Sequence, residues 1–496
     1  MEYRALLMVY LAQKSDYSDR LLGACLRIRG FCWRDGCESD SALLMSKRYR
    51  PWKIDEPMLL PARVQEFVDK DHLARFVLSL VVEEIDLEAI ERVYRVDRGQ
   101  PPFDPAMMTA LLLYGYCNGV YSSRRIAKAC RERVDFMSIV GLDPPDFRTI
   151  SEFRKRHLNA LSALFGQVLR LCERAGLVKL GHVALDGTKI KANASKHKAM
   201  SYERMGKRAE ELEAEVAAWM NAAAAADASE DAAFGRDKSG EEMPAWVGDK
   251  KRRAEKIRAA KAELEAEARA AAEAERQART EAEKKREAEG RKKPGRPAAP
   301  PSDHPDPKAQ KNFTDPESRI MKTKDGFIQG YNAQAAVDAE AQVIVAHGLD
   351  ANGSDQHQLT PMVDAVEANM GRNPEEVSAD AGYCSDANLA AMEERAVDAY
   401  IAAGRAKHPT DGEGGSKRVA DMREKIKAGG HESPYRLRKQ LPEPVFGQIK
   451  QARGFRQFLM RGLDKVAHEW GLVCLAHNML KLAHGRSLSE ADLATT

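Results

Sequence analysis

The chain has 496 residues, of which 43% are hydrophobic and 31% charged, so it can bury a sizeable core and is not a wholly disordered protein. Its 78 Lys and Arg nearly balance 75 Asp and Glu, so a nucleic-acid partner would need a local basic patch rather than a global field. The 8 cysteines lack CxxC spacing, which argues against a zinc ribbon or a disulfide scaffold. No apolar run approaches the roughly 20 residues of a membrane helix, so we expect no membrane partner.

The beginning of the chain divides into an extension and a helical region. Residues 1–44 show no clear hydrophobic period, and we interpret them as a non-essential N-terminal extension. Residues 45–175 carry apolar side chains at helical spacing, and Asp104-Pro105 is a typical helix start, with an aspartate cap before a proline. We therefore predict an all-helical domain over 45–175.

Two short basic segments lie in this helical region. One follows Ser122 and contains Arg124 and Arg125, and the other follows Asp146. Short apolar helices with basic exposed positions are typical of a helix-turn-helix reader of DNA. A helical bundle whose arginines are merely solvated explains the pattern equally well, so both interpretations stay open.

The hydrophobic period changes after residue 176. Residues 177–187 form a short apolar run that ends on Asp186 and a glycine, which predicts a buried strand with a carboxylate at its tip. Residues 200–290 are almost entirely Ala, Glu, Lys and Arg, and predict a solvated helical hairpin or weak coiled coil. A Pro-rich linker extends the insertion to residue 311. Its Gly-Arg-Pro tripeptide at 295–297 suits an AT-rich minor groove, although a charged linker accounts for it nearly as well.

Regular alternation of strands and helices resumes near residue 325. The pattern predicts strands at 330–338 and 342–347, a helix at 356–370, a strand at 377–383, a helix at 385–395, a strand at 399–402 and helices at 435–450 and 463–482. With the strand at 177–187, this order is the layout of an RNase-H-like fold. The predicted fold class is an α/β RNase-H-like catalytic domain, residues 176–199 and 312–482, with an all-helical N-terminal domain, a long helical insertion at 200–311 after the first strand, and a C-terminal tail at 483–496.

Three acids stand at informative places in this layout. Asp186 and Asp380 end the first and fourth strands, which lie side by side in such a sheet, and Glu443 begins the helical part that follows. Phosphodiester cleavage is served by divalent ions that activate water and stabilise the leaving oxygen. Because Mg²⁺ prefers oxygen ligands and keeps several waters, a few carboxylates suffice to bind it. The three acids therefore predict a Mg²⁺ site, with Mn²⁺ as a possible substitute.

Basic residues surround Glu443 in the sequence. At about 100° per residue, Lys450 and Arg453 share a helical face with it, and we expect both to grip phosphates. Lys189 is expected to help from the first strand. For any single acid, ordinary charge balance on a surface helix is the simpler interpretation; three acids in this element order are not explained that way.

Several sequence blocks together resemble the DDE transposases of bacterial insertion sequences. The blocks are Lys47–Pro51, Asp186–Lys189, Ala192–Ser195, Asn312–Arg319, Gly330–Gln334, Asp380–Tyr383 and Glu443–Lys450. The resemblance covers residues 45–482 and implies Asp186, Asp380 and Glu443 as a metal-binding triad.

Further residues follow from the same resemblance. Tyr435, Arg438, Glu443 and Lys450 resemble the tyrosine–arginine–glutamate–lysine signature of related transposases, and all but the acid are expected to contact DNA. The gap between Arg438 and Glu443 is one residue longer here than in that signature.

The resemblance implies an enzyme that binds the ends of its mobile element, as double-stranded DNA, and catalyses metal-dependent cleavage and strand transfer. Because two ends are cut in concert, we expect a homodimer, acting in the cytoplasm at the nucleoid. Two alternatives stay open: a DNA-binding protein with a relic catalytic domain, and a related nuclease that cuts without joining.

Overall fold

The computed structural model describes residues 49–51, 63–94, 101–234, 245–288, 290, 300–403 and 417–494, all within one compact unit of the chain. The predicted extension at 1–44 and the Gly-Arg-Pro tripeptide at 295–297 lie outside the described residues. None of the helices in these ranges is both long and apolar enough to cross a bilayer.

The described part of the predicted helical domain is helical throughout. Its helices are α3 (Leu73–Ser79), α4 (Glu88–Glu91), α5 (Pro105–Cys117), α6 (Ser123–Glu132), α7 (Val134–Val140), α8 (Phe147–Arg156) and α9 (Leu158–Arg174), with 3-10 or π turns at Val64–Phe67, Leu80–Glu84 and Arg92–Tyr94. Asp104 caps α5 by accepting from the amides of Ala106 and Met107, and Asp146 caps α8. Ser122 precedes α6 but makes no side-chain cap bond.

The rest of the core is a mixed sheet. Its strands are β1 (His182–Lys191), β4 (Arg319–Thr323), β5 (Gly326–Asp338), β6 (Ile344–Asp350), β7 (Glu376–Ala379) and β8 (Asp398–Ile401). They are ordered β4-β5-β1-β7-β8, and β6 also pairs with β5. The first strand is antiparallel to β5 and parallel to β7, and β7 is parallel to β8. The helical N-terminal region and the mixed α/β part are thus confirmed, as is the predicted adjacency of β1 and β7.

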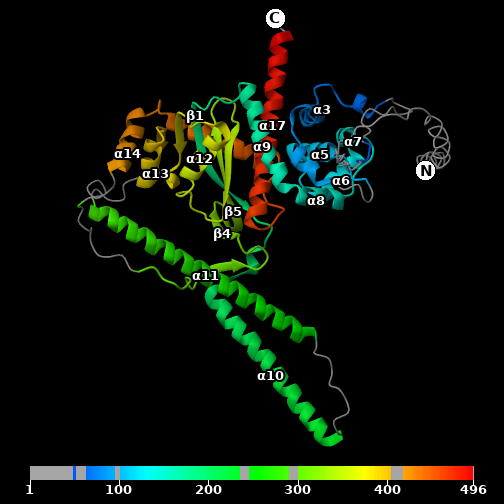
Figure 1. Ribbon diagram of the computed structural model, residues 1–496, viewed down its shortest axis with the longest axis vertical. Helices are drawn as coiled ribbons and strands as arrows, with labels where there is room; N and C mark the ends of the chain where they lie inside the picture. The colour runs from blue at the N-terminus through cyan, green and yellow to red at the C-terminus, as the bar shows by residue number, and fades with distance from the viewer. Residues whose placement is uncertain are drawn as a thin grey trace, which may run out of the picture. The chain divides into compact units, whose positions relative to one another are not determined.

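Helices cover both faces of this sheet. They are α12 (Leu359–Met370), α13 (Asp386–Glu394), α14 (Lys417–Gly429), α15 (Leu437–Gln440), α16 (Pro442–Gly447) and α17 (Leu463–Ala494). On one face Gly348 of β6 packs against Met362 of α12, and on the other its neighbour His347 packs against Gly471 of α17. Helix α17 also lies along α9 and contacts α5 (Figure 1), so one apolar core joins the helical region to the sheet.

Three predicted boundaries are corrected. Strand β1 does not end at Asp186 but continues to Lys191, because each residue through Lys191 pairs with β5. The predicted helix at 435–450 is broken into a 3-10 turn (Pro434–Arg436), α15, α16 and a π turn (Gln448–Ala452). Pro442 begins α16, since a proline cannot donate the hydrogen bond that would continue α15. Finally, α17 runs to Ala494, so residues 483–494 are helical rather than a separate tail.

The insertion is a helical hairpin, as predicted. It consists of α10 (Tyr202–Phe234) and α11 (Ala245–Ala288), which pack against each other through a short apolar seam. The seam is made of Met205, Ala209, Leu212, Ala254, Ile257 and Leu264. At its root, β2 (Ala199–Ser201) pairs with β3 (Gln310–Asn312) in a small separate ladder that the sequence did not predict.

Candidate active site

Asp186 lies in β1, and Asp380 directly follows the neighbouring strand β7, where it caps a 3-10 turn (Ala381–Tyr383); the strand predicted at 377–383 thus ends at Ala379. In the parallel pair of β1 and β7, Ala184 lies opposite Ser378, so two residues further along Asp186 comes opposite Asp380. Adjacent strands are about 4.8 Å apart, and residues two apart share a face. The sheet therefore brings Asp186 and Asp380 together in space although 194 positions separate them in sequence.

The electrostatics of Asp186 reflect this crowding. Burial is the largest cause that raises the pKa of Asp186, to a net value of about 6. The Gly187 amide, which donates to its Oδ1 at 2.8 Å, and Arg438 lower the pKa, while the carboxylates of Asp380 and Asp355 raise it. A carboxylate whose neighbours are also acids keeps its proton unless a cation compensates the charge. The arrangement thus favours a bound cation.

Arg438 provides part of that compensation. Its Nη2 lies 3.5 Å from Oδ2 of Asp380, with side chains 16% and 33% exposed respectively, so the pair is partly shielded from solvent. The other oxygen of Asp380 accepts from the Gly382 amide at 2.8 Å. The structure therefore places Arg438 beside the acid pair despite the unusual spacing before Glu443.

A third aspartate, Asp355, approaches the pair from the loop before α12. One of its oxygens, Oδ1, accepts from Asn332 Nδ2 and Gln334 Nε2, both at 2.7 Å. These two hydrogen bonds fix the carboxylate on the α12 side of the sheet. Sequence reasoning did not identify Asp355. The available signal was indirect: the block Gly330–Gln334, which carries the family resemblance, contains Asn332 and Gln334, the two amides that hold this carboxylate.

Gly187 makes room for this carboxylate. A Cβ atom there would lie 2.6 Å from Oδ1 of Asp355 and would also clash with the Gln334 amide. Gly382 has a similar position after Asp380, where a Cβ would meet Oδ1 of Asp380 at 2.9 Å. Each of the two strands thus has a glycine shortly after its aspartate, for reasons of space rather than chain reversal.

Lys450 reaches the same strand from the π turn. Its Nζ donates to Thr188 Oγ1 at 2.5 Å and to the Lys189 carbonyl at 2.9 Å. Burial lowers the pKa of Lys450 to about 8, while Asp186 acts in the opposite direction. This places a basic group beside the carboxylates, as the sequence led us to expect.

Glu443 is placed differently from the two aspartates. Helix α16 contacts β1, but the Glu443 side chain is exposed and forms no hydrogen bond or ion pair with the described residues. Within those residues, no three His, Cys, Asp or Glu side chains form a ready-made metal cluster. The structure brings together two members of the predicted triad and leaves the third on an adjoining helix, facing solvent.

Arg453 does not take the predicted position. Its Nη2 lies 3.2 Å from His477 Nδ1, its Nη1 is buried without a partner, and burial lowers the pKa of the guanidinium. Its carbonyl oxygen accepts from the Tyr121 hydroxyl at 3.2 Å. Arg453 therefore contacts both the helical region and α17 while staying partly exposed, and its Nε also donates to the Gln448 carbonyl at 3.4 Å. The π turn that follows α16 alters the regular helical spacing assumed for this face, and the expected contact of Arg453 with phosphates stays a prediction.

The remaining predicted contacts on this side are near the sheet. Tyr435 is partly exposed in the 3-10 turn that packs against β7 and β8. The Lys189 side chain is partly exposed next to Gly353, where an added Cβ atom would lie 3.9 Å from Lys189 Cε. Both lie at the same end of the domain as the carboxylates, since their elements adjoin β1 and β7.

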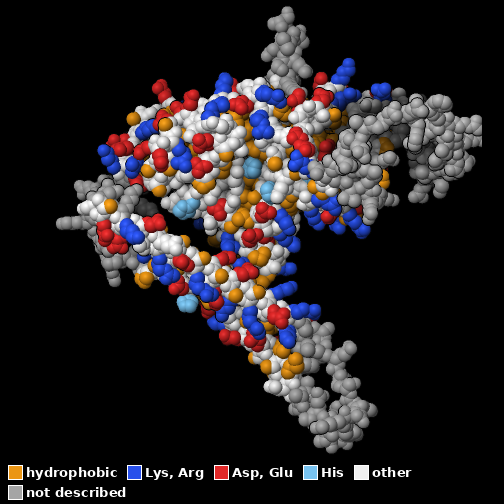
Figure 2. All heavy atoms as spheres, in the orientation of Figure 1, with side chains coloured by type: hydrophobic (Ala, Val, Ile, Leu, Met, Phe, Trp, Pro, Cys, Tyr) orange, Lys and Arg blue, Asp and Glu red, His pale blue; other side chains and the backbone are white. Residues whose placement is uncertain are grey.

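A second candidate surface lies on α6 and α8, which pack against each other. Arg124 and Arg125 are exposed on α6, and the guanidinium of Arg124 lies 5.2 Å from the ring centre of Phe147, with Arg148 at 5.6 Å. Figure 2 shows Lys and Arg side chains gathered near α8. The two arginines predicted to contact DNA thus belong to a local basic patch.

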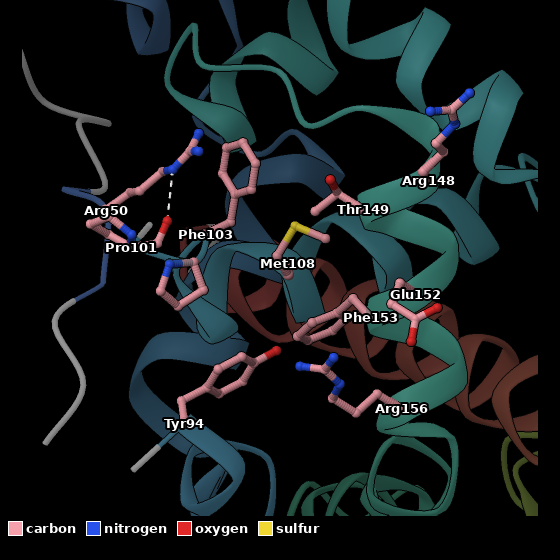
Figure 3. A pocket seen from close by; sticks show the side chains of 11 residues that line it. Arg50, Tyr94, Pro101, Phe103, Met108, Arg148, Thr149, Glu152, Phe153 and Arg156 are labelled. Atoms are coloured by element: carbon pink, nitrogen blue, oxygen red, sulfur yellow. Dashed lines mark hydrogen bonds between the residues drawn. The ribbon is translucent and has the colours of Figure 1, made fainter. Parts of the chain in front are cut away.

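A cavity of about 500 Å³ borders the other side of α8 (Figure 3). Its apolar wall includes Phe103, Met108 and Phe153, and its charged rim includes Arg148 and Arg156. Another cavity of about 430 Å³ is lined by Arg124 and also by Arg148. Arg148 and Glu152 border both cavities, so α8 separates two hollows with one basic and one acidic side chain in common.

Comparison with known proteins finds two family matches in the chain. A family model described as transposase domain (DUF772) matches residues 62–156, and one described as transposase DDE domain matches residues 299–479. The first contains the basic patch on α6 and α8, and the second contains Asp380 and Arg438. No curated protein and no solved structure matches the chain. Since both matches are transposase domains, in the order that the fold requires, the chain belongs to the DDE transposases of insertion sequences.

Proposed function

We propose that this transposase cuts and joins DNA at the carboxylates of Asp186 and Asp380, on an RNase-H-like sheet. The observation that carries the proposal is the register of β1 and β7, which puts these two acids side by side. The strand order around β1 supports the RNase-H-like assignment.

A divalent cation fits these residues. Their donor atoms are carboxylate oxygens, which Mg²⁺ and Mn²⁺ prefer, and Mg²⁺ is commonly held by one or two carboxylates, waters and substrate phosphates. Burial and the neighbouring carboxylates of Asp380 and Asp355 raise the pKa of Asp186, and a bound cation would lower it again. Asp186 and Asp380 would hold the ion, with Glu443 completing the site if α16 turns toward the substrate. When bound, the ion polarises the scissile phosphate and stabilises negative charge on the leaving oxygen.

The protein's own groups position the substrate. Arg438 holds Asp380 in place, and the Asn332 and Gln334 amides hold Asp355. Lys450, fixed by Thr188, places positive charge beside the phosphate to be cut. The same carboxylates serve two successive reactions. Water attacks the phosphodiester at the element's end and displaces a 3′-hydroxyl, which then attacks a phosphodiester of target DNA, bonds to its phosphorus and displaces a 3′-hydroxyl of the target strand.

The helical region supplies the contacts to the element's ends in this proposal. The basic patch on α6 and α8, with Arg124, Arg125 and Arg148, is suited to phosphates and to base edges. A homodimer stays a prediction that rests on the need to process two ends.

The test is nicking of a labelled duplex that carries the flanking repeats, with and without Mg²⁺. We expect a nick with a free 3′-hydroxyl only when the ion is present, and joining of pre-cut ends to a target duplex. Salt-sensitive binding without any product would favour the DNA-binding relic, and cleavage without joining would favour the nuclease.

A further inference from the structure

We propose that a basic cavity at the root of the insertion binds backbone phosphates of the DNA duplex, so that the helical hairpin extends the DNA path that begins at the carboxylates. The inference rests on the proposed function, because it takes DNA as the substrate. It assigns to the insertion a role that neither matched family domain supplies, since both matches leave residues 157–298 uncovered.

The cavity has a volume of about 280 Å³ and is built from both ends of the insertion. Met200, Ile257 and Phe313 form its apolar floor. Basic side chains form its rim: His197, Lys198, Arg253 and Lys256. All four rim residues are exposed, and a charge above an apolar floor is less screened than one surrounded by water.

The walls of the cavity are held rigidly. The β2–β3 ladder pairs Ala199 with Asn312, and Tyr202 donates to Glu265 of α11 at 2.7 Å. Lys311 is only 4% exposed, and its Nζ lies 2.6 Å from Glu263 and 2.9 Å from Glu267. These contacts fasten α11 to the ladder, so the rim cations are presented by a fixed frame.

The rim cations lack the ion pairs that several other cations of the hairpin form. Arg258, for example, pairs with Glu213, and Arg208 pairs with Glu211. Figure 2 shows basic and acidic side chains interspersed along the hairpin. By contrast, Lys198, Arg253 and Lys256 form no ion pair with any residue in the described ranges. Their positive charge is left available to an anion.

A basic path connects this cavity to the carboxylates. From Asp186, β1 continues for five residues to Lys191, a span of about 17 Å. Its continuation is tied to the segment after the π turn, since Phe458 donates to the Lys191 carbonyl at 2.9 Å and Arg461 Nε donates to Asn193. The exposed cations along this path are Lys191, Lys196, Arg456 and Arg461.

The spacing of the path suits a duplex rather than a small anion. DNA carries a negative charge about every 1.7 Å along its axis, so a duplex cut at Asp186 offers phosphates over the whole distance to the cavity. A free phosphate ion would occupy one end of the path and leave the other cations unpaired. The DNA backbone is therefore the ligand that these cations and the cavity fit.

The experiment uses the full chain and a duplex of about 40 base pairs of arbitrary sequence, with binding measured between about 50 and 200 mM salt. The variant R253A/K256A removes two rim cations and keeps the helix, because alanine is a strong helix former. We expect weaker binding and a log–log salt dependence that is shallower by about 2, roughly one for each lost phosphate contact. The matched control, K284A/R286A, removes two exposed cations from the same helix outside the cavity and should keep the wild-type slope.

Each other outcome has a definite meaning. A wild-type slope for R253A/K256A, or an equal change in both variants, would overturn the inference while the proposed function stands. If the wild-type chain itself shows no salt-dependent binding, the proposed function fails and the inference fails with it. Circular dichroism and thermal unfolding of both variants establish that the hairpin is folded. A shallower salt dependence of binding can then be attributed to the removed charges.

Discussion

Two groups of enclosed charges differ in how completely the protein satisfies them. In the middle of the sheet, where β7 ends beside β1, Asp186, Asp380 and Asp355 lie close together with Arg438 as the nearby cation. At the interface with the helical region, Glu469 is fully buried and accepts from the Leu459 and Met460 amides, the latter at 3.0 Å. The first group has three acids beside one cation, whereas in the second group backbone amides bind the carboxylate of Glu469.

The buried group is completed by Arg154. Its Nη1 donates to the Tyr121 carbonyl at 2.7 Å and its Nη2 to Ser123 at 3.1 Å, and its charge lies near Glu469. Buried charges of this kind fix how elements pack. The comparison teaches that enclosure alone does not identify a functional group; the three aspartates stand out because Arg438 is the one cation among the causes that shift the pKa of Asp186.

The largest effect is expected for Asp186→Asn. Loss of a carboxylate that holds a divalent ion removes several kcal/mol of transition-state stabilisation, so Mg²⁺-dependent nicking should fall by about 10³-fold or more. DNA retention in a gel-shift assay should stay near wild type. Asp325→Asn, at the exposed β4–β5 turn, serves as the control and should nick normally. Undiminished nicking by the Asp186 variant would remove this residue from the mechanism.

The next effect concerns Glu469 and pH. Burial raises the pKa of Glu469 from its ordinary 4.5 to about 7, so between these values the folded protein retains a proton that the unfolded chain has released. The contribution of Glu469 to stability should therefore fall by roughly 3 kcal/mol as pH rises from about 4.5 to 7, and level off above. The difference between wild type and the Glu469 variant isolates this contribution from that of the buried His157, His347 and His477, whose lowered pKa values act in the opposite direction. Glu469→Gln should flatten this dependence in urea unfolding, whereas Glu367→Gln, at an exposed position on α12, should not. An identical pH dependence in all three proteins would contradict the assignment.

A smaller effect is expected for Gly187→Ala. The added Cβ would press on Asp355 and Gln334, and such overpacking costs about 1–3 kcal/mol. Both the free energy of unfolding and the nicking rate should decrease, because the displaced carboxylate belongs to the site. Gly181→Ala is the matched control, since nothing lies within 4 Å of its Cβ position. Equal stability of the two variants would argue against the close packing of Asp355 on β1.

The smallest effect is expected when a largely buried arginine and an exposed arginine are compared in their contribution to duplex binding. Arg453→Met replaces an enclosed, incompletely bonded guanidinium by an apolar side chain, so the salt dependence of duplex binding should not change. Arg124→Met, at an exposed position on α6, should make that dependence shallower by about 1. A shallower slope for Arg453→Met would restore its predicted contact with phosphates.

Much of this architecture was predictable from local pattern. Apolar runs and their spacing located the strands and helices around Asp380, and aspartate caps located α5 and α8. The order of elements was enough to expect β1 beside β7, because few topologies accommodate it. This is why Asp186 and Asp380 could be paired from the amino-acid sequence alone.

The rest depended on contacts between distant residues. Asp355 has no distinctive neighbours in sequence, and its place is set by amides that lie more than twenty residues away on β5. Arg453 was assigned by regular helical spacing, but the π turn at Gln448–Ala452 shifts the side chains that follow it. The exposure of Glu443 likewise depends on how α16 packs, which hydrophobic periodicity does not determine.

The small ladder between β2 and β3 has a consequence for how this polypeptide varies. Because Ala199 pairs with Asn312, the chain departs from the sheet and returns to it at adjoining points. Whatever lies between those two positions can lengthen, shorten or be exchanged without altering the spacing of the strands. The ladder therefore closes the base of the insertion, so that the insertion can be gained or lost while the strands that hold the carboxylates keep their positions.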